Sequence, residues 1–186
     1  MTTATKKRVS LYDKTFEEMI PFEELDRHIA RIAERINRDY SNSSQPPIML
    51  AVLNGSFMFM GDLMKKITFN CEVQFIKIAS YDGGHSTGKV HELIGLNSPL
   101  EGRDIIVVED IVETGNSISH LISLLQNKGV ASVAVATMFY KPALYNKEFE
   151  IKYPAMEIGN DFIVGYGLDY KQQGRNLKDI YVIVNE

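Results

Sequence analysis

The stretch Asp104-Ile-Ile-Val-Val-Glu-Asp-Ile-Val-Glu-Thr-Gly-Asn-Ser117 decides the fold of this chain. Its apolar run, residues 105–108, ends in two adjacent carboxylates, Glu109 and Asp110. A third carboxylate, Glu113, follows after two apolar residues, and a helical pattern begins soon afterwards. This order of residues predicts a buried strand, a short loop and the start of a helix.

The residue types around that loop indicate its chemistry. Four consecutive residues can surround an anion with hydroxyl groups and backbone amides: Thr114, Gly115, Asn116 and Ser117. Amides at a helix N-terminus bind phosphate, and glycine lets the backbone approach a ligand closely. Carboxylates suit a hydrated cation or sugar hydroxyls. The combination predicts a site for a phosphorylated sugar that is handled with a divalent metal ion.

The composition is that of an ordinary globular domain. The chain has 186 residues, of which 45% are hydrophobic and 24% charged, and one cysteine, Cys71, which cannot form an internal disulfide. The net charge of −4 argues against a general nucleic-acid binder, because such proteins need a large basic footprint. Residues 1–8 are basic without a following apolar segment, and no apolar run approaches the length of a membrane span. We expect a cytoplasmic protein that binds neither membrane nor nucleic acid.

Strands and helices alternate along most of the chain. Apolar residues at helical spacing predict helices over residues 25–36, 57–67 and 118–125. Short apolar or alternating runs predict strands over 48–53, 73–79, 105–108, 133–138, 162–166 and 180–184. This pattern is typical of an α/β fold with a mainly parallel central sheet flanked by helices. Ligands bind such sheets at the carboxyl ends of the strands, where three loops fall: 54–56, 80–89 and 109–117.

The stretch 104–117 resembles the phosphoribosyl pyrophosphate signature of the type I phosphoribosyltransferases: apolar residues, two acids, two apolar residues, an acid, Thr-Gly, and Ser or Thr. The resemblance implies that Glu109 and Asp110 bind the ribose hydroxyls and lie near Mg²⁺. It implies that the loop 114–117 holds the 5′-phosphate. It places Glu113 near N7 of a purine as a general acid or base. The family usually has Asp at this position, so Glu113 is one methylene longer than expected.

A second loop, Leu53-Asn-Gly-Ser-Phe57, follows the first predicted core strand. Ser56 is a poor candidate nucleophile, because the flanking glycines of a nucleophile elbow are missing. In the resembling family this loop binds pyrophosphate through backbone amides, which assigns Asn54 and Gly55 to that role. We predict a cis peptide between Leu53 and Asn54. Many relatives carry a basic residue at position 54, so the asparagine shifts charge neutralisation to Mg²⁺ and to other cations.

Part of another nucleotide-binding motif is also present. Gly83-Gly-His-Ser-Thr-Gly-Lys89 matches the first seven positions of a P-loop, but position 90 is valine, so the metal-binding hydroxyl is missing. No sustained helical pattern follows it. Ser80 and Tyr81, with residues 86–88, instead resemble the flexible loop that covers the site of the purine enzymes and excludes water.

The C-terminal block Asp161-Phe-Ile-Val-Gly-Tyr-Gly-Leu-Asp-Tyr170 resembles the purine-binding hood of hypoxanthine-guanine phosphoribosyltransferases. The resemblance implies that the aromatic ring of Phe162 stacks on the base and that Ile163 offers backbone contacts. It assigns Asp169 to water-mediated binding of Mg²⁺ and Arg175 to pyrophosphate. Lys141, in Tyr140-Lys-Pro142, matches the lysine that donates to the 6-oxo group of the purine.

The resemblance implies one domain over residues 1–186, with a core at about 40–160 and a small hood, from about 10–20 and 160–186, over the site. It implies transfer of the phosphoribosyl group of phosphoribosyl pyrophosphate to hypoxanthine or guanine in purine salvage, with Mg²⁺ as cofactor. A homodimer or homotetramer is expected. Two other classes stay open, an RNA-binding regulator of the same fold and a P-loop nucleotide hydrolase, and xanthine is the closest competing base.

Overall fold

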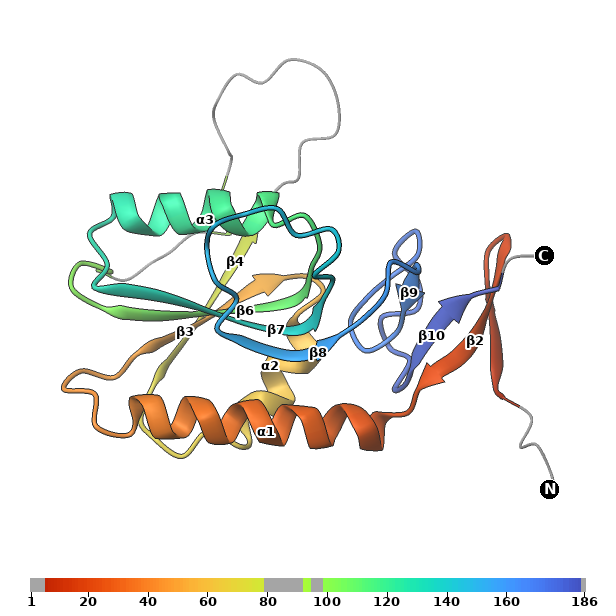
Figure 1. The fold of residues 1–186 in the computed structure, drawn as a ribbon, viewed down its shortest axis with the longest axis horizontal. Helices are drawn as coiled ribbons and strands as arrows, with labels where there is room; N and C mark the ends of the chain where they lie inside the picture. The colour runs from red at the N-terminus through yellow and green to blue at the C-terminus, as the bar shows by residue number, and fades with distance from the viewer. Residues whose placement is uncertain (1–5, 79–91, 95–98, 185–186) are drawn as a thin grey trace, which may run out of the picture.

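The computed structural model describes residues 6–78, 92–94 and 99–184. A six-stranded central sheet has the order β5-β4-β3-β6-β7-β8, and the strands from β4 to β8 run parallel (Figure 1). The strands of this sheet are β3 (Ile48–Leu53), β4 (Glu72–Ile78), β5 (Glu92–Ile94), β6 (Asp104–Val112), β7 (Ser132–Tyr140) and β8 (Tyr153–Glu157). Only β5 pairs antiparallel, at the edge beside β4. The predicted α/β class with a mainly parallel sheet is confirmed.

Helices cover both faces of this sheet, which explains why its strands are almost continuously apolar. The helices α1 (Phe22–Tyr40) and α2 (Phe57–Met64) lie on one face, and α3 (Asn116–Asn127) lies on the other (Figure 1). α2 connects β3 to β4, whereas α3 connects β6 to β7. From β3 the chain continues to β4 on one side of the sheet, and from β6 it continues to β7 on the other side. Such a topological switch point opens a crevice at the carboxyl ends of β3 and β6.

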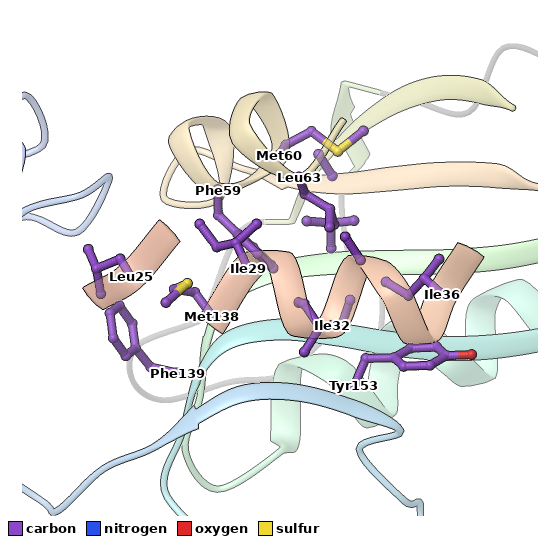
Figure 2. Close-up of a cluster of buried hydrophobic side chains, with 14 of the residues drawn as sticks. Leu25, Ile29, Ile32, Ile36, Phe59, Met60, Leu63, Met138, Phe139 and Tyr153 are labelled. Carbon is purple, nitrogen blue, oxygen red and sulfur yellow. The ribbon is translucent and has the colours of Figure 1, made fainter. Parts of the chain in front are cut away.

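The larger core lies between α1, α2 and the sheet. Residues of α1 at helical spacing, Leu25, Ile29, Ile32 and Ile36, are buried, as the amphipathic pattern predicted. Figure 2 shows them facing side chains from α2, β7 and β8: Phe59, Met60, Leu63, Met138, Phe139 and Tyr153. No helix in the described ranges is long and apolar enough to cross a membrane.

A second, four-stranded antiparallel sheet stands beside the core, at the right of Figure 1. Its order is β1-β2-β10-β9, from β1 (Arg8–Leu11), β2 (Lys14–Ile20), β10 (Ile180–Ile183) and β9 (Ile163–Val164). We call this sheet, with the turns between β9 and β10, the hood. Asp179 joins it to the core, because its Oδ1 accepts a hydrogen bond from the backbone N–H of Phe22 at the start of α1 (2.9 Å).

Several element boundaries differ from the sequence expectations. β6 continues to Val112, beyond the apolar run, because β7 pairs with it along its full length. Glu109 and Asp110 therefore lie within a strand, and Asn116 and Ser117 belong to the first turn of α3 rather than to a loop. The predicted strand 162–166 shrinks to two residues, because Gly165 and Tyr166 adopt positive φ angles and form a turn. The predicted helix 57–67 ends at Met64.

Four strands, β1, β2, β5 and β8, were not predicted from the sequence, and β5 is only three residues long. β1 and β2 carry alternating charged residues and have only a few buried positions, so their apolar signal is weak. β8 contains Pro154, which cannot donate to a ladder, and it is tolerated because β8 is an edge strand.

Candidate active site

Three segments meet at the crevice between β3 and β6. They are the loop after β3, the end of β6 with the start of α3, and the hood turn that follows β9. β3 stops pairing with β6 at Val108, so the next residues of β6 project beyond this neighbour. The two acids at positions 109 and 110 thus stand at the open edge where a ligand would enter.

The predicted phosphate loop forms the wall of a pocket of about 140 Å³. Its lining consists of Glu109 and residues 111–118, so it contains all four predicted phosphate-binding residues. Gly115 has a φ of +80° and immediately precedes α3. A side chain at that position would also collide with the ring of Tyr145, 2.5 Å from its Cε2. Glycine therefore lets α3 begin here with its first amides directed at the pocket.

The paired acids are held in an environment that opposes their ionisation. Burial, and then the neighbouring Asp110 carboxylate, raise the pKa of Glu109 well above its ordinary value. Burial also raises the pKa of Asp110 to about 6, although a hydrogen bond from the backbone N–H of Ile111 to Oδ1 (2.8 Å) works against the shift. Oε2 of Glu109 is buried and has no hydrogen-bond partner among the described residues. The free site is thus short of groups that stabilise negative charge.

The loop after β3 packs directly on these acids. The peptide bond between Leu53 and Asn54 is cis, as predicted. A Cβ on Gly55 would fall 1.3 Å from Oδ2 of Asp110, so only glycine fits against this carboxylate. Asn54 is exposed and Gly55 is buried, which leaves the backbone of the loop beside the acid pair. Ser56 donates to the carbonyl oxygen of Val52 (2.6 Å) and is fully buried, so it is not a nucleophile.

Lys141 and Glu113 form an ion pair that links two predicted site residues. Nζ of Lys141 donates to Oε1 of Glu113 (2.5 Å) and to the carbonyl oxygen of Asp161 (3.1 Å). The lysine side chain is 5% exposed, whereas that of Glu113 is 49% exposed. An ammonium group has three N–H donors, so one remains for a ligand. The extra methylene of Glu113 spans the distance from the end of β6 to the lysine.

The hood carries the predicted aromatic residue at its surface. Phe162 is 46% exposed and packs against Tyr170 (centroids 5.9 Å apart, edge to face) and Phe16 (6.3 Å). Ile163 is buried in β9, with only its backbone positioned for a ligand contact. An exposed ring fixed by aromatic neighbours can accept a flat base on its open face.

Arg175 and Asp169 form a second ion pair in the hood. Nη2 of Arg175 contacts Oδ1 of Asp169 (2.5 Å), and Asp169 Oδ2 accepts from the backbone N–H of Gln172 (2.7 Å). Both groups influence Asp110, since Arg175 lowers and Asp169 raises its pKa. The hood pair therefore lies near Asp110, which is consistent with the contact of Gly167, the residue bound to Arg175, with Gly55.

Mg²⁺ fits this set of donors as an ion that substrate oxygens help to hold. Within the described ranges, no three His, Cys, Asp or Glu side chains converge on one point. Oε2 of Glu109 is buried without a hydrogen-bond partner in the described part of the chain, and a cation or a hydroxyl donor would satisfy it. Mg²⁺ usually keeps several waters and binds through one or two carboxylates together with substrate phosphates. One or two of Glu109, Asp110 and Asp169 would be enough to hold the ion in this way.

Two predicted residues of the covering loop, Ser80 and Tyr81, and the P-loop-like segment 83–89 lie outside the described residues. Sequence reasoning missed the pairing of Lys141 with Glu113, because the two residues are 28 positions apart and no periodicity connects them. It also missed Tyr145, whose contact with Gly115 follows only from the tertiary fold. Gly167, the second glycine of Gly165-Tyr-Gly167, lies against the backbone of Gly55, a close approach of the kind that a Gly-x-Gly sequence indicates.

Comparison with known proteins places the chain and its fold in one family. Residues 21–171 match the model of the phosphoribosyl transferase domain. The chain therefore belongs to the phosphoribosyltransferase family, and its fold is that of the type I enzymes.

Particular relatives narrow the class. The hypoxanthine-guanine phosphoribosyltransferase of Staphylococcus aureus is 35% identical over 87% of this chain and 89% of its own length. A crystal structure of a hypoxanthine phosphoribosyltransferase from the same species superposes with a TM-score of 0.83 at 34% identity, covering 90% of this chain and 91% of that one. The bifunctional protein TilS/HprT of Listeria monocytogenes is 34% identical over 95% of this chain, which spans 27% of that longer protein. None of these relatives supports the RNA-binding regulator or the P-loop hydrolase.

The raised pKa of Asp110 leads to a stability prediction. A carboxyl group whose pKa is higher in the folded state, about 6 against an ordinary 3.8, favours folding below the lower value. That contribution is lost as the pH rises through 6. Replacing Asp110 by Asn should therefore leave the free energy of unfolding unchanged near pH 4 and raise it by about 2 kcal/mol above pH 7.

Urea denaturation followed by circular dichroism at pH 4 to 8 measures this difference. Asp161→Asn is a matched control, because Asp161 is an exposed acid close to the same site. A difference between wild type and Asp110→Asn that stays constant over the whole pH range would contradict the assignment.

Proposed function

We propose that this chain is a hypoxanthine-type purine phosphoribosyltransferase of purine salvage. It joins phosphoribosyl pyrophosphate to N9 of hypoxanthine, and also of guanine, and releases a nucleoside monophosphate and pyrophosphate. Its relatives carry this activity in their names. The observation that carries the proposal is the buried Lys141, held by Glu113 and by the Asp161 carbonyl beneath the exposed Phe162 hood.

The acids of β6 hold the sugar. Glu109 and Asp110 accept hydrogen bonds from the ribose hydroxyls and stabilise the anomeric carbon as it becomes cationic. The amides and hydroxyls of residues 114–117 hold the 5′-phosphate in the pocket at the start of α3. Because both groups come from one continuous segment, the sugar is held at both ends by the same rigid strand and helix.

Arg175 and the loop at Asn54 and Gly55 bind the leaving pyrophosphate. Bound Mg²⁺ supplies charge neutralisation on the pyrophosphate oxygens, with Glu109, Asp110 and Asp169 as its protein-side partners. Arg175 is already oriented by Asp169 and by the carbonyl oxygen of Gly167 (2.8 Å). Preorganised charge of this kind stabilises a leaving group without further rearrangement. Because Asn54 is exposed and uncharged, Arg175 is the main cation for this role among the residues that the structure describes.

Glu113 and Lys141 act on the base. Glu113 takes the proton from N7 of the purine as the new bond forms at N9. Lys141 donates its remaining N–H to the 6-oxo group, and Phe162 stacks on the ring. A 6-amino group offers no acceptor to the lysine, so the buried ammonium would stay partly unpaired against adenine. The site therefore favours hypoxanthine and guanine.

The protein works in the cytoplasm as a homodimer or homotetramer, by analogy with the family that its motifs resemble. The hood and core act as one domain in this proposal, since the site uses residues of both. The part of the chain that the structure describes offers no helix for membrane insertion, and its net charge of −4 does not suit a nucleic-acid partner.

The role of Lys141 predicts a change in base preference. In Lys141→Met, kcat/KM for hypoxanthine should fall about 10- to 100-fold, because a hydrogen bond from a charged donor is lost. The low rate with adenine should change little. Steady-state kinetics with hypoxanthine, guanine, xanthine and adenine, each with phosphoribosyl pyrophosphate and Mg²⁺, measure this and test the proposed function itself.

Lys128→Met, at an exposed lysine after α3, serves as the control and should match wild type. Equal losses for hypoxanthine and adenine in Lys141→Met would show that the lysine does not read the 6-position. Absence of nucleotide formation by wild type with all four bases would disprove the function.

The role of Glu113 predicts a loss in turnover. Glu113→Gln keeps an oxygen that can accept from Lys141 but cannot take a proton, so kcat should fall about 100-fold or more while KM for hypoxanthine stays within a few-fold. Rapid-quench or steady-state assays at pH 7.5 measure this. Glu148→Gln, at an exposed acid after β7, is the matched control. A turnover in Glu113→Gln close to that of wild type would exclude Glu113 as the base.

A further inference from the structure

The turn after β9 brings the hood into contact with the core at one point. Residues 165 and 168 pair with each other, through hydrogen bonds from Gly165 N–H to Leu168 O (3.1 Å) and from Leu168 N–H to Gly165 O (3.0 Å). Tyr166 and Gly167 form the tip, with φ angles of +48° and +100°. A tyrosine rarely adopts a positive φ, so other contacts must hold this tip in place.

The Tyr166 side chain supplies such a contact. Its hydroxyl donates to Oδ2 of Asp62 on α2 (2.7 Å), and the residue is 1% exposed. Burial, and then the hydrogen bond to Asp62, raise the pKa of Tyr166, so the phenol stays a donor at all working pH values. Its ring also packs beside Phe22 at the start of α1 (centroids 5.9 Å apart). Tyr166 therefore fastens the tip to the layer of helices beneath the sheet.

Gly167 connects the tip of this turn to the groups that are proposed to bind pyrophosphate, the loop after β3 and Arg175. A Cβ on Gly167 would lie 2.0 Å from the carbonyl oxygen of Gly55, so the two backbones are in direct contact. The carbonyl oxygen of Gly167 accepts from Nη1 of Arg175 (2.8 Å), and its N–H donates to the carbonyl oxygen of Arg175 (3.0 Å). One residue thus touches both the loop after β3 and the arginine of the hood.

We infer that Tyr166 and Asp62 are a positioning pair that sets the gap between the Gly55 loop and the Arg175–Asp169 ion pair. The inference rests on the proposed function, in which both of these groups bind the leaving pyrophosphate. Tyr166 and Asp62 do not line the phosphate pocket. The pair acts through Gly167 on the leaving-group half of the site and leaves the purine half, around Lys141, unaffected.

The chain provides a matched control for this inference. Tyr153 is also fully buried, and its hydroxyl donates to Oδ2 of Asp39 on α1 (2.6 Å). Tyr153 lies in the edge strand β8, two strands away from β6, and its hydroxyl reaches Asp39 near the C-terminal end of α1, far along the chain from the hood turn. Tyr153→Phe removes the same kind of hydrogen bond as Tyr166→Phe, to the same kind of acceptor, without a connection to the pyrophosphate groups.

The experiment compares Tyr166→Phe, Asp62→Asn and Tyr153→Phe with wild type. Isothermal calorimetry measures the Kd for pyrophosphate in the presence of Mg²⁺, and thermal melts measure stability. Tyr166→Phe should weaken pyrophosphate binding and raise KM for phosphoribosyl pyrophosphate about tenfold, the effect of one hydrogen bond to a charged group. KM for hypoxanthine should stay within twofold. Asp62→Asn retains an acceptor oxygen for the Tyr166 hydroxyl and should therefore keep most of the wild-type affinity for pyrophosphate.

Tyr153→Phe should lower the melting temperature by a similar amount and leave the Kd for pyrophosphate unchanged. The inference is overturned if Tyr166→Phe and Tyr153→Phe lose stability equally and neither changes that Kd by more than twofold. It is also overturned if Tyr166→Phe raises both KM values together. A wild-type chain that binds pyrophosphate but transfers no phosphoribosyl group would contradict the proposed function alone, because the Kd values of the variants still decide the role of the pair.

Discussion

The burial of two adjacent carboxylates at the end of β6 is the constraint on which the rest of the site depends. Glu109 and Asp110 project beyond the point where β3 leaves the ladder, and both have raised pKa values. Burying charge without a partner is unfavourable. In the part of the fold that the structure describes, the two acids lack a cation or hydroxyl donors that would stabilise their ionised forms. In the proposed function, ribose hydroxyls and a substrate-borne Mg²⁺ would stabilise these carboxylates. In that proposal, the carboxylates that bind the sugar are already in position in the free protein.

Other parts of the molecule follow from that arrangement. Position 55 must be glycine because Asp110 occupies the space of a side chain, and position 167 must be glycine because the carbonyl oxygen of Gly55 does the same. The hood can then approach the core closely enough for Arg175 and Asp169 to influence the pKa of Asp110. On the other side, Glu113 leaves the strand end and pairs with the buried Lys141. A single strand end thus organises the sugar, leaving-group and base regions.

Much of this could be predicted from the sequence, for reasons of local chemistry. The amphipathic spacing of α1 and the apolar runs of β3, β6 and β7 are strong signals, because both faces of a parallel sheet must be covered. The order of acids, Thr-Gly and Ser in one segment predicted a phosphate-binding loop, and the structure has a pocket lined by this segment. The sequence did not reveal where β6 ends, because pairing with β7, a tertiary contact, extends it past the apolar run. Nor did it reveal the bond between Tyr166 and Asp62, whose partners are 104 positions apart. The strands β1 and β2 were not predicted, because a small sheet buries few residues and leaves only a weak apolar pattern in the sequence.

The ionisation of Asp110 tests most directly whether the site is built around buried acids. Carbon-13 NMR of the side-chain carboxyl groups, titrated from pH 4 to 8, would follow Asp110 in the free protein and in the presence of phosphoribosyl pyrophosphate and Mg²⁺. We expect a pKa of about 6 for Asp110 in the free protein, and a clearly lower pKa once the cation and the sugar hydroxyls stabilise the carboxylate. An ordinary pKa near 4 in both states would contradict the claim that the site is built around buried acids that await their ligand.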